Sequence, residues 1–197
     1  MLSGGRPFTA LYLAALIVAA CTGGAAPSFD PSGPCTVDGR RAGAYPELEA
    51  QIPKTVAGKP PLSLDSGRNC SAVNLGTLAN HGLTEVRFAG GVWTDSAQSG
   101  VTLAIFTAPG LEADWMGEWY EAGARAARQT GALKTSRVQV GGQPANRLDL
   151  VNGDSSQTVI TWAAPPGTSG ASGTRVNVVI AADEPESRIQ QAIAAFP

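Results

Sequence analysis

Three cysteines and one histidine carry most of the reactive chemistry in this 197-residue sequence. The cysteines are Cys21, Cys35 and Cys70, and His81 is the single histidine. Thiols can pair as a disulfide, bind a metal or accept a covalent group, and imidazole ordinarily titrates near neutral pH. A redox pair or a zinc site normally uses CxxC spacing or a nearby histidine, and neither accompanies these cysteines. The sequence therefore predicts no metal site and no cofactor.

His81 and a group of acids are the remaining candidates for catalysis. His81 stands at the end of a predicted helix, where the helix dipole and free carbonyl groups favour a cation, so we expect a capping role. The acids could supply the carboxylate pair of a glycosidase, but they lie early in a second predicted helix, where the dipole explains them. They are Glu112, Asp114, Glu118 and Glu121. No GxSxG, HExxH, EF-hand or GxxxxGK motif occurs, so we assign no catalytic residue and expect no enzyme.

The front of the chain reads as a secretory signal over residues 1–20. Arg6 is the one charge before ten apolar residues, 11–20, which rise about 15 Å as a helix and cannot span a bilayer. Val18-Ala19-Ala20-Cys21 resembles a bacterial lipobox. The resemblance implies a mature chain that starts at Cys21, with diacylglycerol on its sulfur and often a further acyl group on its amine. An ordinary signal cut after Ala20 is the alternative reading.

With lipid on Cys21, an even pair of cysteines remains in an oxidising compartment. We therefore expect a Cys35–Cys70 disulfide, whose closed loop stabilises the fold by roughly 3–4 kcal/mol in the chain-entropy account. Residues 22–34 are small, rich in Pro and Gly and without periodicity, so 21–34 is predicted to be a flexible tether. Residues 35–197 suit one domain. The expected location is the cell membrane, lipid-anchored, on its extracytoplasmic face.

Charge excludes one class of partner. Without residues 1–20 the chain has 13 basic and 16 acidic side chains, which is unlike the basic surface of a nucleic-acid-binding protein. Arg40-Arg41 could bind a phosphate or a lipid headgroup, but exposed solubilising charges explain the pair. The lipid is then the membrane contact.

Hydrophobic periodicity predicts alternating helices and strands. Helices are expected at 45–53, 71–81, 111–129 and after Pro185; strands at 62–64, 83–94, 101–108, 135–140, 145–151, 156–163 and 174–181. In the long helix, Leu111, Trp115, Trp119, Ala122 and Ala126 form the stripe expected to face the core. Gly90-Gly91 suggests a bulge or a close backbone approach. The fold class is α+β, with an antiparallel sheet of about six or seven strands and one long and several short helices packed on it.

Two segments carry a resemblance. Gln51-Ile52-Pro53 followed by Gly58 and Pro61-Leu62, together with the ending VNVVIAADEP…IQQAIAAFP, resembles small envelope lipoproteins of actinobacteria and related bacteria. The resemblance covers most of residues 45–197 and implies a cellular location and a fold more than an activity. The element order is also similar to PsbP-like α+β domains, which serve as membrane-tethered accessory subunits.

Three functions follow as hypotheses. The first is a non-enzymatic binding or accessory protein at the cell envelope, which predicts an exposed apolar patch for a protein or polymer. The second is a carrier of a small apolar molecule or lipid, with a pocket beneath Trp115 and Trp119. The third is a hydrolase in which His81 meets an acid and a hydroxyl. No ligand-binding residue is assigned; loop 165–173 and the stretch from Gly90 to Trp93 are the segments with the freedom to recognise a partner.

Overall fold

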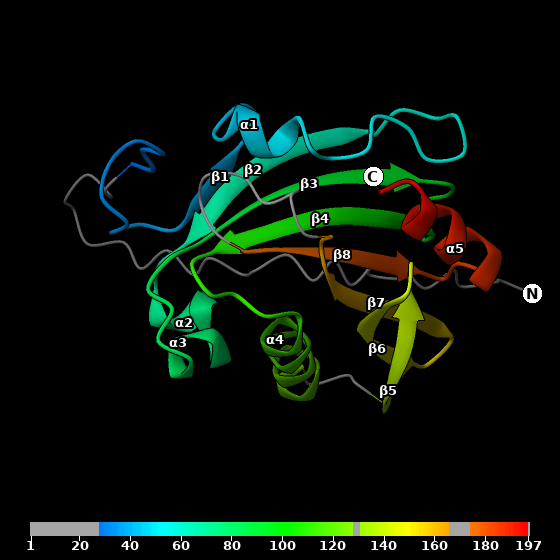
Figure 1. The fold of residues 1–197 in the computed structure, drawn as a ribbon. Helices are drawn as coiled ribbons and strands as arrows, with labels where there is room; N and C mark the ends of the chain where they lie inside the picture. The colour runs from blue at the N-terminus through cyan, green and yellow to red at the C-terminus, as the bar shows by residue number, and fades with distance from the viewer. Residues whose placement is uncertain (1–27, 128–130, 166–173, 197) are drawn as a thin grey trace, which may run out of the picture.

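A computed structural model describes residues 28–127, 131–165 and 174–196, and in them eight strands form one antiparallel sheet (Figure 1). The order across the sheet is β1-β2-β3-β4-β8-β7-β6-β5. The strands are β1 Gly39–Arg41, β2 Ser63–Asn69, β3 Val86–Thr94, β4 Gly100–Ala108, β5 Ala132–Val140, β6 Gln143–Asn152, β7 Ser155–Ala163 and β8 Thr174–Ala182. The α+β class is confirmed, and the sheet has more strands than the six or seven predicted.

Helices cover both faces of this sheet (Figure 1). Helices α2 Ala72–Leu75, α3 Thr77–Asn80 and α4 Ala113–Ala126 lie on one face, and α1 Pro46–Glu49 and α5 Glu186–Ala194 lie on the other. Each face has its own hydrophobic core: Leu78 and Met116 belong to the first, and Leu48, Trp93 and Ile189 to the second. We call these the α4 face and the α1 face. The central strands β4 and β8 are buried on both, as an apolar run predicts.

The second half of the sheet follows the predicted hairpins. Strands β5, β6 and β7 pair in chain order, and β8 joins β7 to β4. The tight turns contain Gly141, Gly142 and Gly153, all at positive φ, where a glycine avoids the strain that other residues meet. Short-range turn chemistry therefore fixes the register of three neighbouring strands.

The first half of the chain differs from prediction in three places. Strand β1 was not expected, and it pairs with only Ser66–Arg68 of β2. Strand β2 itself continues to Asn69, well beyond the predicted 62–64. The expected helix 71–81 is broken into α2 and α3 at Gly76, whose φ of +50° is a backbone conformation that favours glycine.

Helix α4 turns a different stripe to the sheet from the one predicted. Met116, Gly117 and Ala124 are buried, whereas Ala122 and Ala126 are exposed. A Cβ on Gly117 would lie 3.0 Å from the Asn146 side chain, so this glycine lets the helix approach β6. The expected Ala122 and Ala126 contacts are therefore wrong. Leu111, just before the helix, is buried as expected.

The Gly90-Gly91 pair forms no bulge. Strand β3 keeps unbroken register with β2 and with β4 through both glycines. Gly91 is instead a place of close approach, because the Trp93 ring lies within 2.9 Å of where a Cβ would stand. Trp93 is 2% exposed and donates its indole N–H to the Lys59 carbonyl at 2.9 Å. The idea that this stretch displays an indole for recognition is therefore wrong.

Candidate functional site

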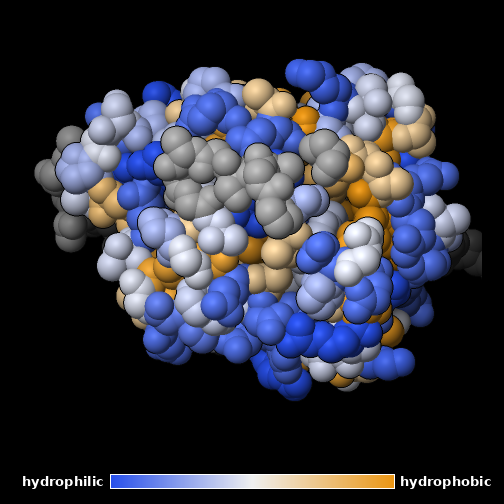
Figure 2. All heavy atoms as spheres, in the orientation of Figure 1, coloured by the Kyte–Doolittle hydropathy of each residue, from blue (hydrophilic) through white to orange (hydrophobic). Residues whose placement is uncertain are grey.

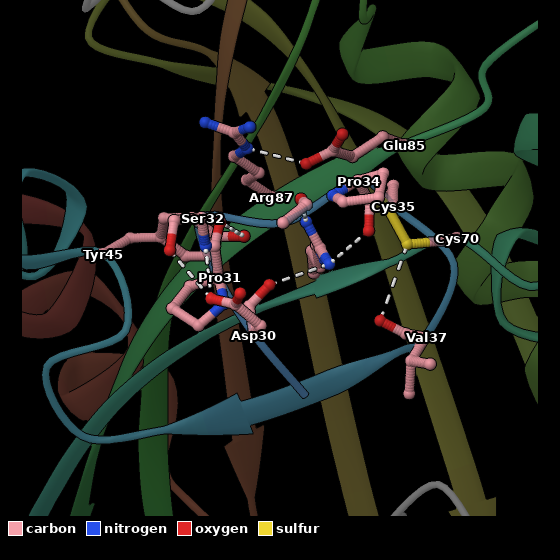
Figure 3. A network of polar contacts seen from close by, with 12 residues as sticks. Asp30, Pro31, Ser32, Pro34, Cys35, Val37, Tyr45, Cys70, Glu85 and Arg87 are labelled. Atoms are coloured by element: carbon pink, nitrogen blue, oxygen red, sulfur yellow. Dashed lines mark hydrogen bonds and ion pairs between the residues drawn. A yellow bond between two sulfur atoms is a disulfide. The ribbon is translucent and has the colours of Figure 1, made fainter. Parts of the chain in front are cut away.

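The segment that precedes the sheet is held by a buried arginine. Arg68 on β2 donates to three backbone carbonyl groups, those of Asp30 at 3.0 Å, Gly33 at 2.7 Å and Pro34 at 2.8 Å. The Tyr45 hydroxyl donates to the carbonyl of Pro31 at 3.3 Å (Figure 3). Residues 29–34, which composition assigned to a tether ending at Pro34, therefore lie against β1 and β2. We call Arg68 and this segment the N-terminal clamp.

A disulfide closes the same region. Cys35 and Cys70 are bonded, with Cα atoms 5.7 Å apart (Figure 3), so the predicted disulfide is present. Asp38 strengthens the junction, since its carboxylate accepts hydrogen bonds from the backbone N–H groups of Cys70 and Ser71 and from the Asn74 amide. Cys21, its predicted lipid and the signal 1–20 lie outside the described residues.

Three arginines form a row across the α1 face at one end of the sheet. Arg68 of β2 stands opposite Arg87 of β3, which stands opposite Thr107 of β4, and Thr107 stands opposite Arg175 of β8. Like charges in such a row repel unless each has partners. Arg87 pairs with Glu85 at 2.7 Å, and its guanidinium lies 5.0 Å from the centre of the Tyr45 ring. Arg68 has the carbonyl groups of the clamp, so two members of the row are compensated.

Arg175 is compensated least. It is 4% exposed, and its Nη1 donates to the Gln51 side chain at 3.0 Å, while Nε and Nη2 have no partner among the described residues. Burial lowers the pKa of this guanidinium, and no carboxylate offsets that effect. Two residues along β8, Asn177 is fully buried, and neither its amide nitrogen nor its amide oxygen has a partner there. Buried polar groups without a partner are uncommon in folded proteins and are costly to stability.

His81 lies at the C-terminal end of α3, as predicted, and its ring contacts two side chains of α4. Nε2 lies 2.8 Å from a carboxylate oxygen of Glu118, and the imidazole stacks on the Trp115 ring with centroids 4.4 Å apart. No hydroxyl among the described residues is hydrogen-bonded to the imidazole. The structure thus brings His81 and an acid together without the third group that the hydrolase hypothesis requires.

Two of the other acids, Asp114 and Glu121, line a groove beside α4 and pair with bases. Asp114 binds Arg137 through two hydrogen bonds of 2.7 and 2.9 Å, and the Arg137 guanidinium lowers the pKa of this carboxyl. Glu121 pairs with Arg125, as their i,i+4 spacing predicts. Glu112 is exposed at the start of the helix. The groove, between α4, β5 and β6, holds about 410 Å³. Its charges neutralise one another, and they form no pair of free carboxylates.

The space beneath the two tryptophans of α4 is filled. Trp119 contacts Phe106 and Tyr120, with ring centroids 6.1 and 4.9 Å apart, and donates its indole N–H to the Asn74 carbonyl. Burial raises the pKa of the Tyr120 hydroxyl. Both tryptophans are half-buried, at the flank of α4 that faces α3. Aromatic side chains therefore occupy the place where the carrier hypothesis expects its pocket.

Exposed apolar side chains are few and dispersed. Large ones occur at Leu62, Val73 and Val151 within the described ranges, and Figure 2 shows hydrophobic residues in small areas separated by hydrophilic ones. Leu62 lines a hollow of about 370 Å³ with Pro60 and Pro61, next to the part of β2 that β1 leaves unpaired. The pair Arg40-Arg41 is exposed, with Arg40 Nε 3.7 Å from a carboxylate oxygen of Asp65. Of the candidate loop 165–173, residues 166–173 lie outside the described residues.

Sequence reasoning did not find Arg68, Arg175 or Asn177. A signal was present in the last strand, where Arg175 and Asn177 alternate with Val176 and Val178 in a run that is otherwise apolar. Polar residues two apart in a central strand share one buried face, so they need a partner. Arg68 gave no such signal, because its partners are backbone groups more than thirty residues away.

Two further findings concern the described residues alone. They contain no group of three or more His, Cys, Asp and Glu side chains placed to hold a metal ion. None of their helices is long and apolar enough to cross a membrane. Comparison with protein-family models, with curated proteins and with solved structures finds no match to this chain.

Proposed function

We propose that this chain is an extracytoplasmic lipoprotein, anchored to the cell membrane through lipid on Cys21, that acts as a non-enzymatic binding or accessory protein at the cell envelope. The observation that carries the proposal is the Cys35–Cys70 disulfide at the point where the N-terminal segment enters the sheet. Disulfides persist in oxidising compartments. This one stands 14 residues after a cysteine whose preceding residues, Val18-Ala19-Ala20, resemble a lipobox.

The N-terminal clamp supports the same reading. In an anchored domain, a force on the anchor reaches the fold through the segment that follows the anchor. Here Arg68 of β2 binds the carbonyl groups of Asp30, Gly33 and Pro34, and the disulfide joins Cys35 to Cys70, directly after β2. Only eight residues separate Cys21 from Asp30, the first residue whose carbonyl group Arg68 binds. The domain would then stand close to the lipid headgroups.

Binding is favoured over catalysis because His81 and the acidic side chains of α4 that could act in catalysis already have partners. His81 is engaged by Glu118 and Trp115, and the acids of α4 that line the groove are paired with basic side chains. Among the described residues, the buried polar atoms without partners include those of Arg175 and Asn177, which are hydrogen-bonding groups with no nucleophilic atom. No observation favours the apolar carrier, since aromatic rings fill the place expected for its pocket.

Metabolic labelling tests the anchor. A bacterial host that processes lipoproteins would express the full-length chain while fed alkyne-tagged palmitate, and the label would be read on the protein after a gel. We expect label on the wild type and none on Cys21→Ala. The matched control is Cys35→Ala, which loses a different thiol and should keep the label. An unlabelled wild type, or equal label on Cys21→Ala, would refute the proposal.

A further inference from the structure

We propose that β5, the outermost strand at one end of the sheet, pairs antiparallel with β5 of a second copy of this chain, so that one sheet continues across a twofold axis. Strand β5 pairs with β6 alone, and its other edge has no strand partner among the described residues (Figure 1). Such an edge is a template for another strand, because its outward N–H and C=O groups lack partners. The pairing goes beyond the proposed binding function and does not depend on the lipid anchor.

Strand β5 lacks most of the features that protect the edges of monomeric sheets. It runs for nine residues, Ala132–Val140, in unbroken register with β6, and it contains no proline. Its two charged side chains are Lys134 and Arg137, and two hydrogen bonds to Asp114 hold Arg137 over the α4 face. Short edge strands, bulges, prolines and charges at the edge are the usual protection. Here only Lys134 remains to provide it.

Symmetry and charge favour a second copy as the partner, in one register. A twofold axis perpendicular to the sheet keeps the same face up in both copies, so residues opposite each other come from the same face. The register that pairs all nine residues places the axis at Ser136. Arg137 is then opposite Thr135 of the second copy, and Lys134 is opposite Val138 of the second copy. No like charges are opposite each other, whereas an axis at Lys134 or Arg137 would oppose two cations.

The groove beside α4 supports this arrangement. Thr135 and Arg137 both line the groove, and the register places each opposite the other across the axis, so the grooves of the two copies adjoin. Strand β5 contains bases and no acid, while the helix side of the groove carries the carboxylates of Asp114, Glu118 and Glu121. These carboxylates offset the positive charge of two β5 strands brought together, so the surface is complementary to itself.

The same axis suits two anchored chains. Strands β1 and β5 are the opposite edges of the sheet, so the N-terminal clamp lies at the edge remote from the proposed interface. Phe29, in the clamp, packs against the core of the α1 face. Because the axis keeps that face on the same side in both copies, both clamps lie on one side of the joined sheet. This arrangement lets both lipids enter one membrane.

Cysteine cross-linking in intact host cells tests the pairing. Ser136→Cys places a thiol at the proposed axis, where the two Cα atoms would be about 4.5–5.5 Å apart, within the range of a disulfide. The matched control is Lys134→Cys, on the same strand and face, because the two Cα atoms at position 134 would be about 14 Å apart. We expect mild oxidation to give a linked dimer of Ser136→Cys, about tenfold less of Lys134→Cys, and none of the wild type.

A proline variant tests the pairing without a cross-link. The two-residue β5–β6 turn is closed by Val140 and Gln143, which exchange both hydrogen bonds. Alternate residues counted back from Val140 bond to β6, so the N–H of Thr135 points to the free edge. Thr135→Pro removes this donor and should make the mature chain monomeric in detergent, whereas Thr135→Val keeps the donor and should stay dimeric. Sedimentation measures the two masses.

Several results would overturn the proposal. Equal cross-linking of Ser136→Cys and Lys134→Cys, or none of either, would do so, and so would an adduct of Ser136→Cys with a different protein. A wild-type chain that is monomeric at every concentration would also overturn it. The cysteine pair decides the question even where Thr135→Pro fails to fold. Cross-linking does not depend on palmitate, so the pairing and the anchor can fail separately.

Discussion

Arg68 is a buried cation whose hydrogen-bond partners are backbone carbonyl groups, with the Phe29 ring 5.6 Å from its guanidinium. Such groups are always present in a chain, so a side chain that gathers three of them can fix a segment that has no hydrophobic pattern of its own. This is how residues rich in Pro and Gly become ordered against β2. At the scale of single residues, the molecule uses polar contacts where its sequence lacks apolar ones.

Replacing Arg68 should therefore cost stability. Arg68→Met keeps the apolar stem and removes three hydrogen bonds from a charged donor, and we expect the free energy of unfolding to fall by about 2–3 kcal/mol. Urea denaturation measures this change. Arg40→Met, on the neighbouring strand with 65% of its side chain exposed, should change it by less than about 0.5 kcal/mol. Equal effects of the two variants would show that the clamp contributes nothing.

Asp38 makes stability depend on pH. Burial acts to raise the pKa of this carboxyl, but the hydrogen bonds from Cys70, Ser71 and Asn74 outweigh it and hold the pKa below its usual range. A carboxyl with a lowered pKa stabilises the folded state above its ordinary pKa, and this contribution is lost as the pH falls through the folded-state pKa. Asp38→Asn should lower the free energy of unfolding by about 1 kcal/mol at pH 7. The difference from wild type should shrink between about pH 5 and pH 3.

The control for Asp38 is Asp154→Asn, in the exposed β6–β7 turn. Denaturation curves at pH 3, 5 and 7 should show no comparable change for this variant. A deficit of Asp38→Asn that stayed constant over the whole range would contradict the role given to its charge.

At the scale of elements, local rules predicted the second half of the sheet and failed in the first. Strands β5 to β8 alternate clearly and are linked by glycine turns, so their existence and pairing follow from short stretches of sequence. Strand β1 is a three-residue segment that pairs with residues 25 to 29 positions away, and nothing in the sequence Gly39–Arg41 predicts it. In α4 the predicted stripe was right for Trp115 and Trp119, which are half-buried against the core, and wrong for Ala122 and Ala126. Met116, Gly117 and Ala124 are the residues that the helix buries.

Adjacent glycines of β3 offer an element-scale test. A Cβ on Gly91 would meet the Trp93 ring at 2.9 Å and Ile52 at 3.2 Å, while a Cβ on Gly90 would meet Ala104 at an ordinary 3.6 Å. Gly91→Ala should thus force Trp93 or Ile52 to move and lower the free energy of unfolding by about 1–3 kcal/mol. Gly90→Ala should be close to neutral. Thermal unfolding compares the two; equal melting temperatures would contradict the packing described.

At the scale of the whole molecule, one sheet carries two separate cores, and the chain enters it at the β1–β2 edge. The α4 face is packed with aromatic and aliphatic side chains, whereas the α1 face combines an apolar core with a polar row that ends at Arg175. Alternating hydrophobic residues and hairpin turns could reveal most of the sheet from sequence. The row could not be foreseen, because Arg68, Arg87 and Arg175 become neighbours only through the pairing of four strands.

The disulfide belongs to this scale because it ties the entry of the chain to the sheet. It joins residues separated by 35 positions. Reduction should lower the free energy of unfolding by roughly 3–4 kcal/mol and release the N-terminal segment. Limited proteolysis with and without reductant would follow the release, with cleavage expected first between Asp30 and Cys35. Identical digestion patterns in the two conditions would contradict this role.

The intact mass of the full-length protein, extracted gently from the membranes of a host that processes lipoproteins, tests the central claim most directly. We predict a chain that begins at Cys21, carries the mass of a diacylglyceryl group with or without a further acyl chain, and lacks two hydrogens because Cys35 and Cys70 are bonded. A chain with an unmodified Cys21, or one cut elsewhere, would contradict the lipid anchor and the envelope function proposed for this fold.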